Sequence, residues 1–519
     1  MLRGRLTHRP TVEKYVKKIL ASRVYDVANE TPLQRARLLS RRLDNEVRLK
    51  REDLQPVFSF KIRGAYNRMA QLSEEDRARG VIAASAGNHA QGVALAAREL
   101  GIRATIVMGR NTPSIKIEAV RDLGARVVLH GDNYDDASAH AQRLVAQEGF
   151  VYVHPFDDPD VIAGQGTVGM EIMNQHPGAP DAIFVPVGGG GLIAGIGAYV
   201  KYLAPATRVI GVEAEGSACM TAALAAGRRV RLPFDSLDLF ADGTSVAQAG
   251  KETFRLAKRC VDETVTVNTD EICAAIKDLF DDTRSIAEPS GALAVAGMKK
   301  YCAANGTSGK NLVAVVSGAN VNFDRLRHIS ERAEVGEQRE VVLGVTIPEK
   351  KGSFRKFCRA LGKHPVSEFN YRFASDREAH VYVGLQVADQ GDRPKLIDSL
   401  TGAGYPVSDM TDNEAAKLHV RHMVGGRTFG GKREILYRFE FPERPGALMR
   451  FLSVLGTGWN ITMFHYRNHG AAWGRVLAGF EVSDESLDEE RRRLTEYLKR
   501  IGYRYWEETD NPAYELFLR

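Results

Sequence analysis

The sequence predicts an α/β fold over residues 1–330, followed by two copies of a smaller α+β domain. In the first part, short runs rich in β-branched residues alternate with longer amphipathic stretches, which is typical of parallel sheets covered by helices on both faces. In the last part, a stretch of sequence recurs 94 residues later. A length of 519 residues also exceeds what one hydrophobic core accommodates, so several domains are expected.

The alternation of strands and helices is clearest between residues 80 and 130. Three predicted strands and the two helices between them lie, in chain order, at residues 80–84, 89–100, 104–108, 115–123 and 126–129. Further strands are predicted at residues 182–187, 208–212 and 311–317. Because these runs are almost entirely apolar, we expect strands that are buried on both faces.

One uncharged segment, residues 182–200, is long enough to span a bilayer. Pro186 and the four glycines at 188–191 would interrupt a helix at its middle, so we predict a buried strand, a loop and the start of a helix instead. The formal net charge of +6 over 519 residues is too dilute for a nucleic-acid-binding surface. We therefore expect neither a membrane nor a nucleic-acid partner.

The five cysteines, at positions 219, 260, 273, 302 and 358, form no Cys-x-x-Cys pair. Cys and His residues also lack the spacing of a zinc site, so no metal centre is predicted. This cysteine usage is typical of a reduced, cytoplasmic protein. The first residues lack the apolar core of a signal peptide, which agrees with that expectation.

Residues 331–338 are charged, have no apolar period and are predicted to form a linker. Beyond them, four segments match in the same order: 347–354 with 441–448, 361–362 with 455–456, 369–372 with 464–467, and 383–387 with 478–482. Chance explains one such match but not four at a nearly constant offset. We predict a duplicated domain at 339–411 and 434–506, after a first domain at 1–330, with each copy running strand, helix, strand, strand, helix, strand.

The first motif with candidate chemistry is Lys61, which stands between Phe60 and Ile62 at a predicted helix start. Burial among apolar neighbours favours the uncharged amine, which is the form that attacks carbonyl groups. A single lysine of this kind is more often a surface residue whose stem covers apolar side chains.

The second motif comprises Ser85, Ala86, Gly87, Asn88 and His89, directly after a predicted strand. The hydroxyl of Ser85 and the backbone N–H groups at the helix start would favour an anion, although an ordinary helix cap has the same residues.

The third motif is Gly188, Gly189, Gly190 and Gly191 with Leu192, again between a strand and a helix. Glycines let backbone amides close around a phosphate without clashes from Cβ atoms. No Lys-Ser/Thr pair follows, so the motif is not a P-loop, and its spacing differs from the dinucleotide fingerprint. A flexible turn is the alternative.

Together with Ser317-Gly318-Ala319-Asn320, these motifs resemble the fold type II (tryptophan synthase β-like) pyridoxal-phosphate (PLP) enzymes, and among them the biosynthetic threonine dehydratases, over about residues 5–330. The resemblance implies a two-lobed catalytic domain. It also implies that Lys61, next to Phe60, forms a Schiff base with PLP, and that Asn88 hydrogen-bonds the 3′ oxygen of the cofactor. The glycines 188–191 with Leu192 would hold its phosphate, and Ser317 would face its pyridine nitrogen. Ser85, Ala86, Gly87 and His89 would hold the substrate carboxylate.

The implied reaction is the β-elimination and deamination of L-threonine to 2-oxobutanoate and ammonia, the first step of isoleucine biosynthesis, with L-serine to pyruvate as a second activity. Lys61 is expected to remove the α-proton, and the neutral Ser317 leaves PLP a weaker electron sink, which favours prompt loss of the β-hydroxyl. Two alternatives remain: a serine dehydratase or racemase, and an amino-acid sensor on an inactive PLP fold. Many racemase-like relatives bind a cation near a Gly-Val-Glu segment. Here Gly211-Val212-Glu213 is followed by Cys219 where a ligand is expected, so no such site is predicted.

The duplicated C-terminal segments resemble ACT domains, because Arg444-Pro445-Gly446-Ala447-Leu448 is similar to the motif between their first strand and first helix. Two such domains after a dehydratase resemble the feedback-regulated form of the enzyme. That form implies isoleucine as inhibitor, valine as opposing effector and a homotetramer. A passive oligomerisation module is the alternative.

Overall fold

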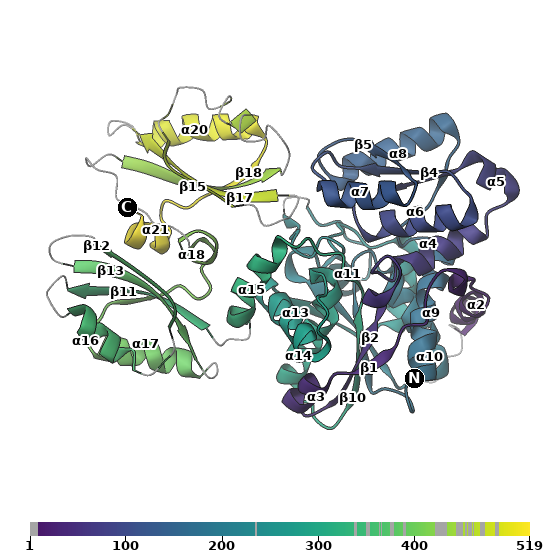
Figure 1. Ribbon diagram of the computed structural model, residues 1–519, viewed down its shortest axis with the longest axis horizontal. Coiled ribbons are helices and arrows are strands. Elements are labelled where there is room, and N and C mark those ends of the chain that lie inside the picture. Colours follow the sequence, from purple (N-terminus) through teal and green to yellow (C-terminus); the bar gives the residue numbers. More distant parts are fainter. Residues whose placement is uncertain are drawn as a thin grey trace. The chain divides into compact units, whose positions relative to one another are not determined.

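The computed structural model divides the chain into two compact units, Met1–Ile329 and Ser330–Arg519, called here the N-terminal and C-terminal units (Figure 1). It describes residues 9–233, 236–336, 340–348, 353–362, 364, 366–373, 378–387, 391–420, 433–442, 450–451, 454, 459, 461–467, 473–482 and 487–518. Across these residues, no helix combines the length and apolar character needed to cross a membrane.

The small lobe of the N-terminal unit is built on a four-stranded parallel sheet of order β5-β4-β3-β6. Its strands are β3 (Val81–Ala84), β4 (Ala104–Met108), β5 (Arg126–Leu129) and β6 (Val151–Tyr152). Its helices are α5 (Glu74–Arg79), α6 (Asn88–Leu100), α7 (Ser114–Asp122) and α8 (Tyr134–Glu148). Strand β3 is buried on both faces, because Val81 and Ala83 pack in the same cluster as α6, while Ile82 and Ala84 pack in the cluster of α8. The predicted strands and helices of this region are confirmed.

The large lobe contains a six-stranded sheet of order β1-β2-β10-β7-β8-β9, parallel except for β1. Its strands are β1 (Leu33–Arg35), β2 (Glu46–Arg51), β7 (Ala182–Pro186), β8 (Arg208–Ala214), β9 (Glu263–Val267) and β10 (Asn311–Val316). The remaining helices of the unit are α2 (Arg9–Leu20), α3 (Arg37–Leu43), α4 (Lys61–Ala70), α9 (Pro159–Gln175), α10 (Gly191–Leu203), α11 (Cys219–Ala226), α12 (Lys251–Cys260), α13 (Thr269–Thr283) and α14 (Pro289–Asn305). Ile183 and Val185 of β7 face the cluster of α9 and α10, whereas Phe184 contacts Tyr301 of α14 on the other face, with ring centroids 5.4 Å apart.

Helices α9 and α10 approach closely where two glycines meet. A Cβ atom added at Gly195 would lie 2.5 Å from the Ile162 carbonyl oxygen and 2.7 Å from the Gly166 Cα. Only hydrogen atoms fit between the backbones at this crossing. The contact therefore fixes the axis of α10, and with it the glycine-rich loop at its N-terminus.

The C-terminal unit contains two four-stranded antiparallel sheets with equivalent orders, β12-β13-β11-β14 and β16-β17-β15-β18. Their strands are β11 (Glu340–Pro348), β12 (Val366–Phe373), β13 (Glu378–Gln386), β14 (Val407–Asp409), β15 (Arg433–Pro442), β16 (Ile461–Arg467), β17 (Trp473–Val482) and β18 (Arg504–Glu507). The helices are α16 (Ser353–Ala360), α17 (Asp392–Gly402), α18 (Glu414–Leu418), α20 (Leu487–Ile501) and α21 (Pro512–Phe517). The duplication is confirmed.

A shared apolar cluster lies between the two sheets of the C-terminal unit, where Figure 1 shows α18 and α21. Tyr382 of the first sheet meets Phe517 of α21 edge to face, with ring centroids 5.4 Å apart. Leu436 and Leu477 of the second sheet belong to the same cluster. The two copies therefore pack on each other through the last helix of the chain.

The predicted linker at 331–338 is wrong over most of its length, because helix α15 extends over Arg325–Gly336. The buried positions of α15 include Arg325, His328, Ile329, Arg332 and Ala333, which recur at helical spacing. Three of the five are charged or polar, so the buried stripe has no hydrophobic period. Arg332 is held by Glu414, with 2.5 Å between guanidinium and carboxylate.

Candidate functional site

The residues singled out in the sequence come from the carboxyl ends of three parallel strands. Ser85 follows β3, the four glycines follow β7 after Val187, and Ser317 follows β10. Ligands of open α/β sheets bind at this edge. Lys61, the first residue of α4, is joined to the same edge because Ser59 pairs with Gly318 and the Phe60 N–H donates to the Ser317 carbonyl oxygen at 3.3 Å.

The environment of the Lys61 amine lowers its pKa. Its Nζ donates to the Pro155 carbonyl oxygen at 3.3 Å and lies 5.2 Å from the centre of the Phe60 ring. Burial lowers the pKa of Lys61 to about 8, against a weaker opposing effect of the Glu288 carboxylate. The uncharged amine is therefore far more populated near neutral pH than in an ordinary lysine.

The glycine-rich loop packs tightly against protein on its outer side. A Cβ at Gly189 would lie 2.4 Å from the Phe156 ring, and one at Gly190 would lie 2.4 Å from the Met220 methyl group. The Gly189 carbonyl oxygen accepts from Thr253 Oγ1 at 2.6 Å and from the Gly250 N–H at 3.2 Å. Because C=O and N–H point in opposite directions across a trans peptide, the following N–H points away from these partners.

The same loop opens helix α10, whose N-cap, Gly190, makes no side-chain capping hydrogen bond. N–H groups in the first turn of a helix have no partner within the helix, and the helix dipole favours negative charge there. The loop thus offers a cradle of backbone donors without side chains. This arrangement fits the phosphate of PLP, and the adjoining buried amine of Lys61 fits its aldehyde.

Asn88 and Ser317 are tied to one segment at the start of α14. Asn88 Nδ2 donates to Glu288 Oε1 at 2.6 Å, and Ser317 Oγ donates to the Ser290 carbonyl oxygen at 3.3 Å. Glu288 is buried, and burial followed by repulsion from Asp242 raises its pKa to about 7. The two predicted cofactor contacts are therefore brought to one place.

Only some of the groups in the loop at residues 85–89, which is proposed to hold the substrate carboxylate, are free to bind it. Ser85 Oγ accepts from the Gly87 N–H at 3.3 Å, and a Cβ at Gly87 would meet nothing within 4 Å. The His89 ring is buried, with Nε2 bonded to the Val153 carbonyl oxygen at 2.8 Å. Burial and the nearby Lys61 lower the pKa of His89 to about 3. His89 can therefore contribute its backbone N–H, whereas a cationic imidazole is excluded.

In the segment Gly211-Val212-Glu213, the carboxylate of Glu213 stabilises the start of a helix. This carboxylate accepts from the Met220 N–H at 2.9 Å, the Thr221 N–H at 2.7 Å and Thr221 Oγ1 at 2.6 Å, and so caps helix α11. Across the part of the chain that the structure describes, no cluster of three His, Cys, Asp or Glu side chains is placed to hold a metal ion.

Sequence reasoning missed three contributors to the site: Glu288, the Pro155 carbonyl oxygen and Gln165. Gln165 is fully buried, shares the Pro155 acceptor with Lys61, and has its Oε1 2.3 Å from where a Gly191 Cβ would lie. The contact between Asn88 and Glu288 spans 200 residues, so no local motif records it. The only local signal is Glu288 before Pro289 at a helix start.

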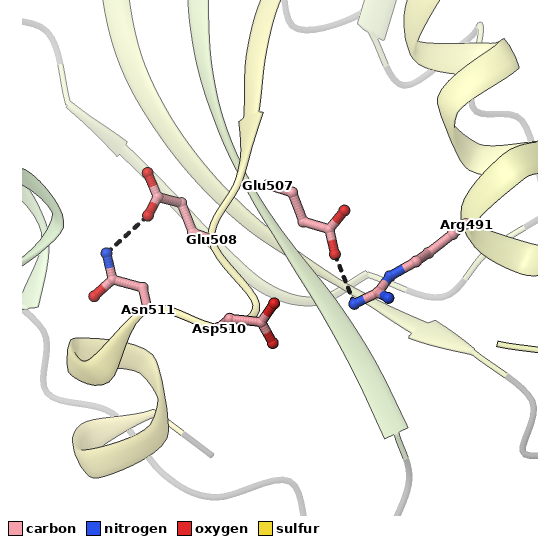
Figure 2. A pocket seen from close by; sticks show the side chains of 5 residues that line it. All are labelled: Arg491, Glu507, Glu508, Asp510 and Asn511. Atoms are coloured by element: carbon pink, nitrogen blue, oxygen red, sulfur yellow. Dashed lines mark hydrogen bonds and ion pairs between the residues drawn. The ribbon is translucent and has the colours of Figure 1, made fainter. Parts of the chain in front are cut away.

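A separate polar hollow of about 340 Å³ lies in the C-terminal unit, lined by Arg491, Glu507, Glu508, Asp510 and Asn511 (Figure 2). Arg491 reaches from α20 to Glu507 at 2.9 Å, and Asn511 donates to Glu508 at 2.8 Å. The charged and polar lining does not suit a branched apolar side chain.

The comparisons with known proteins cover both units. Residues 24–318 match the family described as pyridoxal-phosphate dependent enzyme, and residues 331–420 and 425–518 match the C-terminal regulatory domain of threonine dehydratase. The biosynthetic L-threonine dehydratase IlvA of Burkholderia multivorans is 55% identical over 507 residues, which are 97% of this chain and 99% of that protein.

Solved structures match part of this chain. The processed form of threonine deaminase isoform 2 from Solanum lycopersicum is 51% identical, with a TM-score of 0.61, over 62% of this chain and 94% of that chain. Maize serine racemase is 32% identical, with a TM-score of 0.57, over 61% of this chain and 95% of that chain.

Proposed function

Since this chain belongs to the biosynthetic threonine dehydratases, PLP-dependent enzymes with a C-terminal regulatory domain, we propose that it deaminates L-threonine to 2-oxobutanoate and ammonia. The observation that carries this proposal is the placement of Lys61. Its amine has a lowered pKa and a single carbonyl partner, and it lies beside a glycine cradle that opens a helix. L-serine, converted to pyruvate, is the expected second substrate.

In this proposal, each group of residues has one task. When bound, PLP supplies the electron sink for negative charge at the substrate α-carbon. The N–H groups of residues 188–192 hold the phosphate, and Asn88 and Ser317 orient the ring. The backbone around Gly87 binds the substrate carboxylate, where a Cβ would meet open space. Lys61, uncharged and directed by the Pro155 carbonyl oxygen, removes the α-proton, and loss of the β-hydroxyl follows.

The serine racemase alternative has less support. The match to the regulatory family extends to residue 518, and the 55% identity to a threonine dehydratase covers both units. The racemase match covers 61% of the chain at 32% identity. The ratio of threonine to serine turnover still depends on one methyl group, which a pocket distinguishes by only about 1–3 kcal/mol.

The proposal extends to regulation and assembly. The C-terminal unit would bind isoleucine as inhibitor and valine as opposing effector, in a cytoplasmic homotetramer. Regulation requires that each effector bind two states of the enzyme with different affinity. Light scattering coupled to size exclusion tests the tetramer directly.

The decisive experiment is to supply the purified, PLP-loaded protein with L-threonine and to measure 2-oxobutanoate, with and without isoleucine. We expect product formation that isoleucine suppresses. Lys61→Ala should lower the rate by at least about 10²–10⁴-fold, because it removes the proton acceptor. Lys17→Ala, on the exposed face of α2, is the control and should not change it. Turnover of serine without turnover of threonine would refute the proposal.

A further inference from the structure

The side-chain amide of Asn88 is held from both ends. Asn88 Nδ2 donates to Glu288 Oε1 at 2.6 Å, and Asn88 Oδ1 accepts from Asn320 Nδ2 at 2.5 Å. An amide NH₂ only donates hydrogen bonds, and the Glu288 carboxyl only accepts them when it is ionised, which is the main form above its pKa of about 7. The two partners therefore specify which end of the Asn88 amide carries nitrogen.

Asn320 is itself held in one orientation. Its Nδ2 also donates to the Val57 carbonyl oxygen at 2.9 Å, and its Oδ1 accepts from Gln91 Nε2 at 3.4 Å. A backbone carbonyl oxygen can only accept, so the nitrogen of Asn320 must face Val57 and Asn88. Gln91 and Glu288, at the two ends of the series, are both buried.

These contacts form a chain with one direction, from Gln91 through Asn320 and Asn88 to Glu288. Reversing the amide of Asn88 or of Asn320 would set oxygen against oxygen at one junction and nitrogen against nitrogen at the other. Such a mismatch is costly where side chains are removed from water. One hydrogen of Asn88 Nδ2 is used by Glu288, and the second stays available to a ligand.

We infer that Asn320 and Glu288 are positioning residues that fix the amide of Asn88 so that its nitrogen, and not its oxygen, is presented to the ring oxygen of the cofactor. The inference rests on the proposed function, because it takes Asn88 as a cofactor contact. A reversed amide would place a carbonyl oxygen against the electron-rich ring oxygen of PLP. Losing a hydrogen bond to a charged group weakens binding by about ten- to a hundredfold.

The test uses the full-length protein freed of its cofactor and titrated with pyridoxal phosphate. The dissociation constant is read from the visible absorption of the bound cofactor, and the unfolding midpoint is measured before cofactor is added. Asn320→Asp places an acceptor against both Asn88 Oδ1 and the Val57 carbonyl oxygen. We expect a dissociation constant raised about tenfold or more, a shifted absorption maximum and a lower unfolding midpoint. Asn305→Asp, an exposed asparagine on α14, makes the same change of charge and should leave all three unchanged.

A double variant, Asn320→Asp with Glu288→Gln, separates orientation from stability. Its partners suit the reversed amide, since Gln can donate to Asn88 Oδ1 and Asp can accept from Asn88 Nδ2. We expect the unfolding midpoint to recover in part, because the aspartate still faces the Val57 carbonyl oxygen, while the dissociation constant stays raised. Recovery of both would show that the chain of amides only stabilises the fold, and wild-type affinity in Asn320→Asp alone would also overturn the inference. If the wild-type protein binds no pyridoxal phosphate, the proposed function itself fails.

Discussion

At the scale of single residues, the chemistry of the site depends on the lowered pKa of the Lys61 amine. Burial is the main cause of its lowered pKa, and the carboxylate of Glu288 partly offsets it. Between the folded pKa of about 8 and the unfolded value of 10.5, the unfolded chain retains a proton that the folded chain has lost. This group therefore adds stability to the cofactor-free protein as the pH rises through that window, and none of that gain is present below it.

The first prediction concerns the reactivity of the Lys61 amine. In the cofactor-free protein, reductive methylation of Lys61 should reach half its maximal rate at about pH 8, because only the uncharged amine attacks formaldehyde. Peptide mapping over pH 6–10 measures it, with N-acetyl-lysine amide as the reference amine. Glu288→Gln removes a negative charge that favours the ammonium, so it should move the midpoint below that of the wild type. A midpoint equal to that of the reference would contradict the assignment.

The second prediction concerns Arg63, which is two residues after Lys61 in α4 and fully buried. Its guanidinium lies 2.7 Å from Glu52 and 2.5 Å from Glu171, and although burial opposes it, these carboxylates raise the pKa of Arg63. Arg63→Met would remove the paired cation of the buried Glu52 and leave Glu171 paired with Lys50 alone, at 2.5 Å, and should reduce the free energy of unfolding by about 3–5 kcal/mol.

Urea unfolding followed by circular dichroism measures this loss. Arg68→Met, on the same helix, is the control. The Arg68 pair with Asp158 is partly exposed, at 3.2 Å, so the cost there should be about 1 kcal/mol or less. Equal losses in the two variants would show that the buried cluster has no special role in fixing α4.

At the scale of elements, the strands and glycine loops could be predicted because their signals are local. Strand β7 is five apolar residues, and the break at Gly188 is visible in the sequence itself. Helix α15 could not be predicted from apolar periodicity, because three of its buried positions are occupied by the charged or polar residues Arg325, His328 and Arg332. The partner of Asn88 was equally hidden, because Glu288 comes close only after two sheets have formed.

The third prediction concerns the glycine loop as an element. Gly189→Ala should lower the affinity for pyridoxal phosphate by at least about tenfold, because its methyl group would overlap the Phe156 ring, 2.4 Å away, and push the loop out of place. Titration of the cofactor-free protein measures the affinity. Gly402→Ala, at the end of α17, is the control, since a Cβ there meets nothing within 4 Å. Unchanged affinity in Gly189→Ala would mean that the loop does not hold the phosphate.

At the scale of the whole molecule, the chain consists of a catalytic unit and a regulatory unit that have separate cores. The apolar clusters of the two α/β sheets lie within residues 24–315, and those of the duplicated domains begin at Val341. The processed tomato threonine deaminase matches 62% of this chain over 94% of its own length. A cut between the units is therefore a direct test of the proposal that effectors bind the C-terminal unit.

The fourth prediction follows from where that cut is made. A chain ending at Gly336 keeps all of α15, whereas one ending at Arg332 would remove Ala333, which is buried, from the helix. We expect the chain that ends at Gly336 to form 2-oxobutanoate from threonine at a rate within about threefold of the full-length protein, and to ignore isoleucine at concentrations that inhibit the full-length protein. The reason is thermodynamic: an effector can shift an equilibrium only through a site that it occupies, and the proposed site has been removed.

Inhibition that persists in the shortened chain would place the isoleucine site in the catalytic unit. Loss of both activity and fold would instead mean that the regulatory unit is needed to stabilise the catalytic one, which the unfolding midpoint of the shortened chain would show directly.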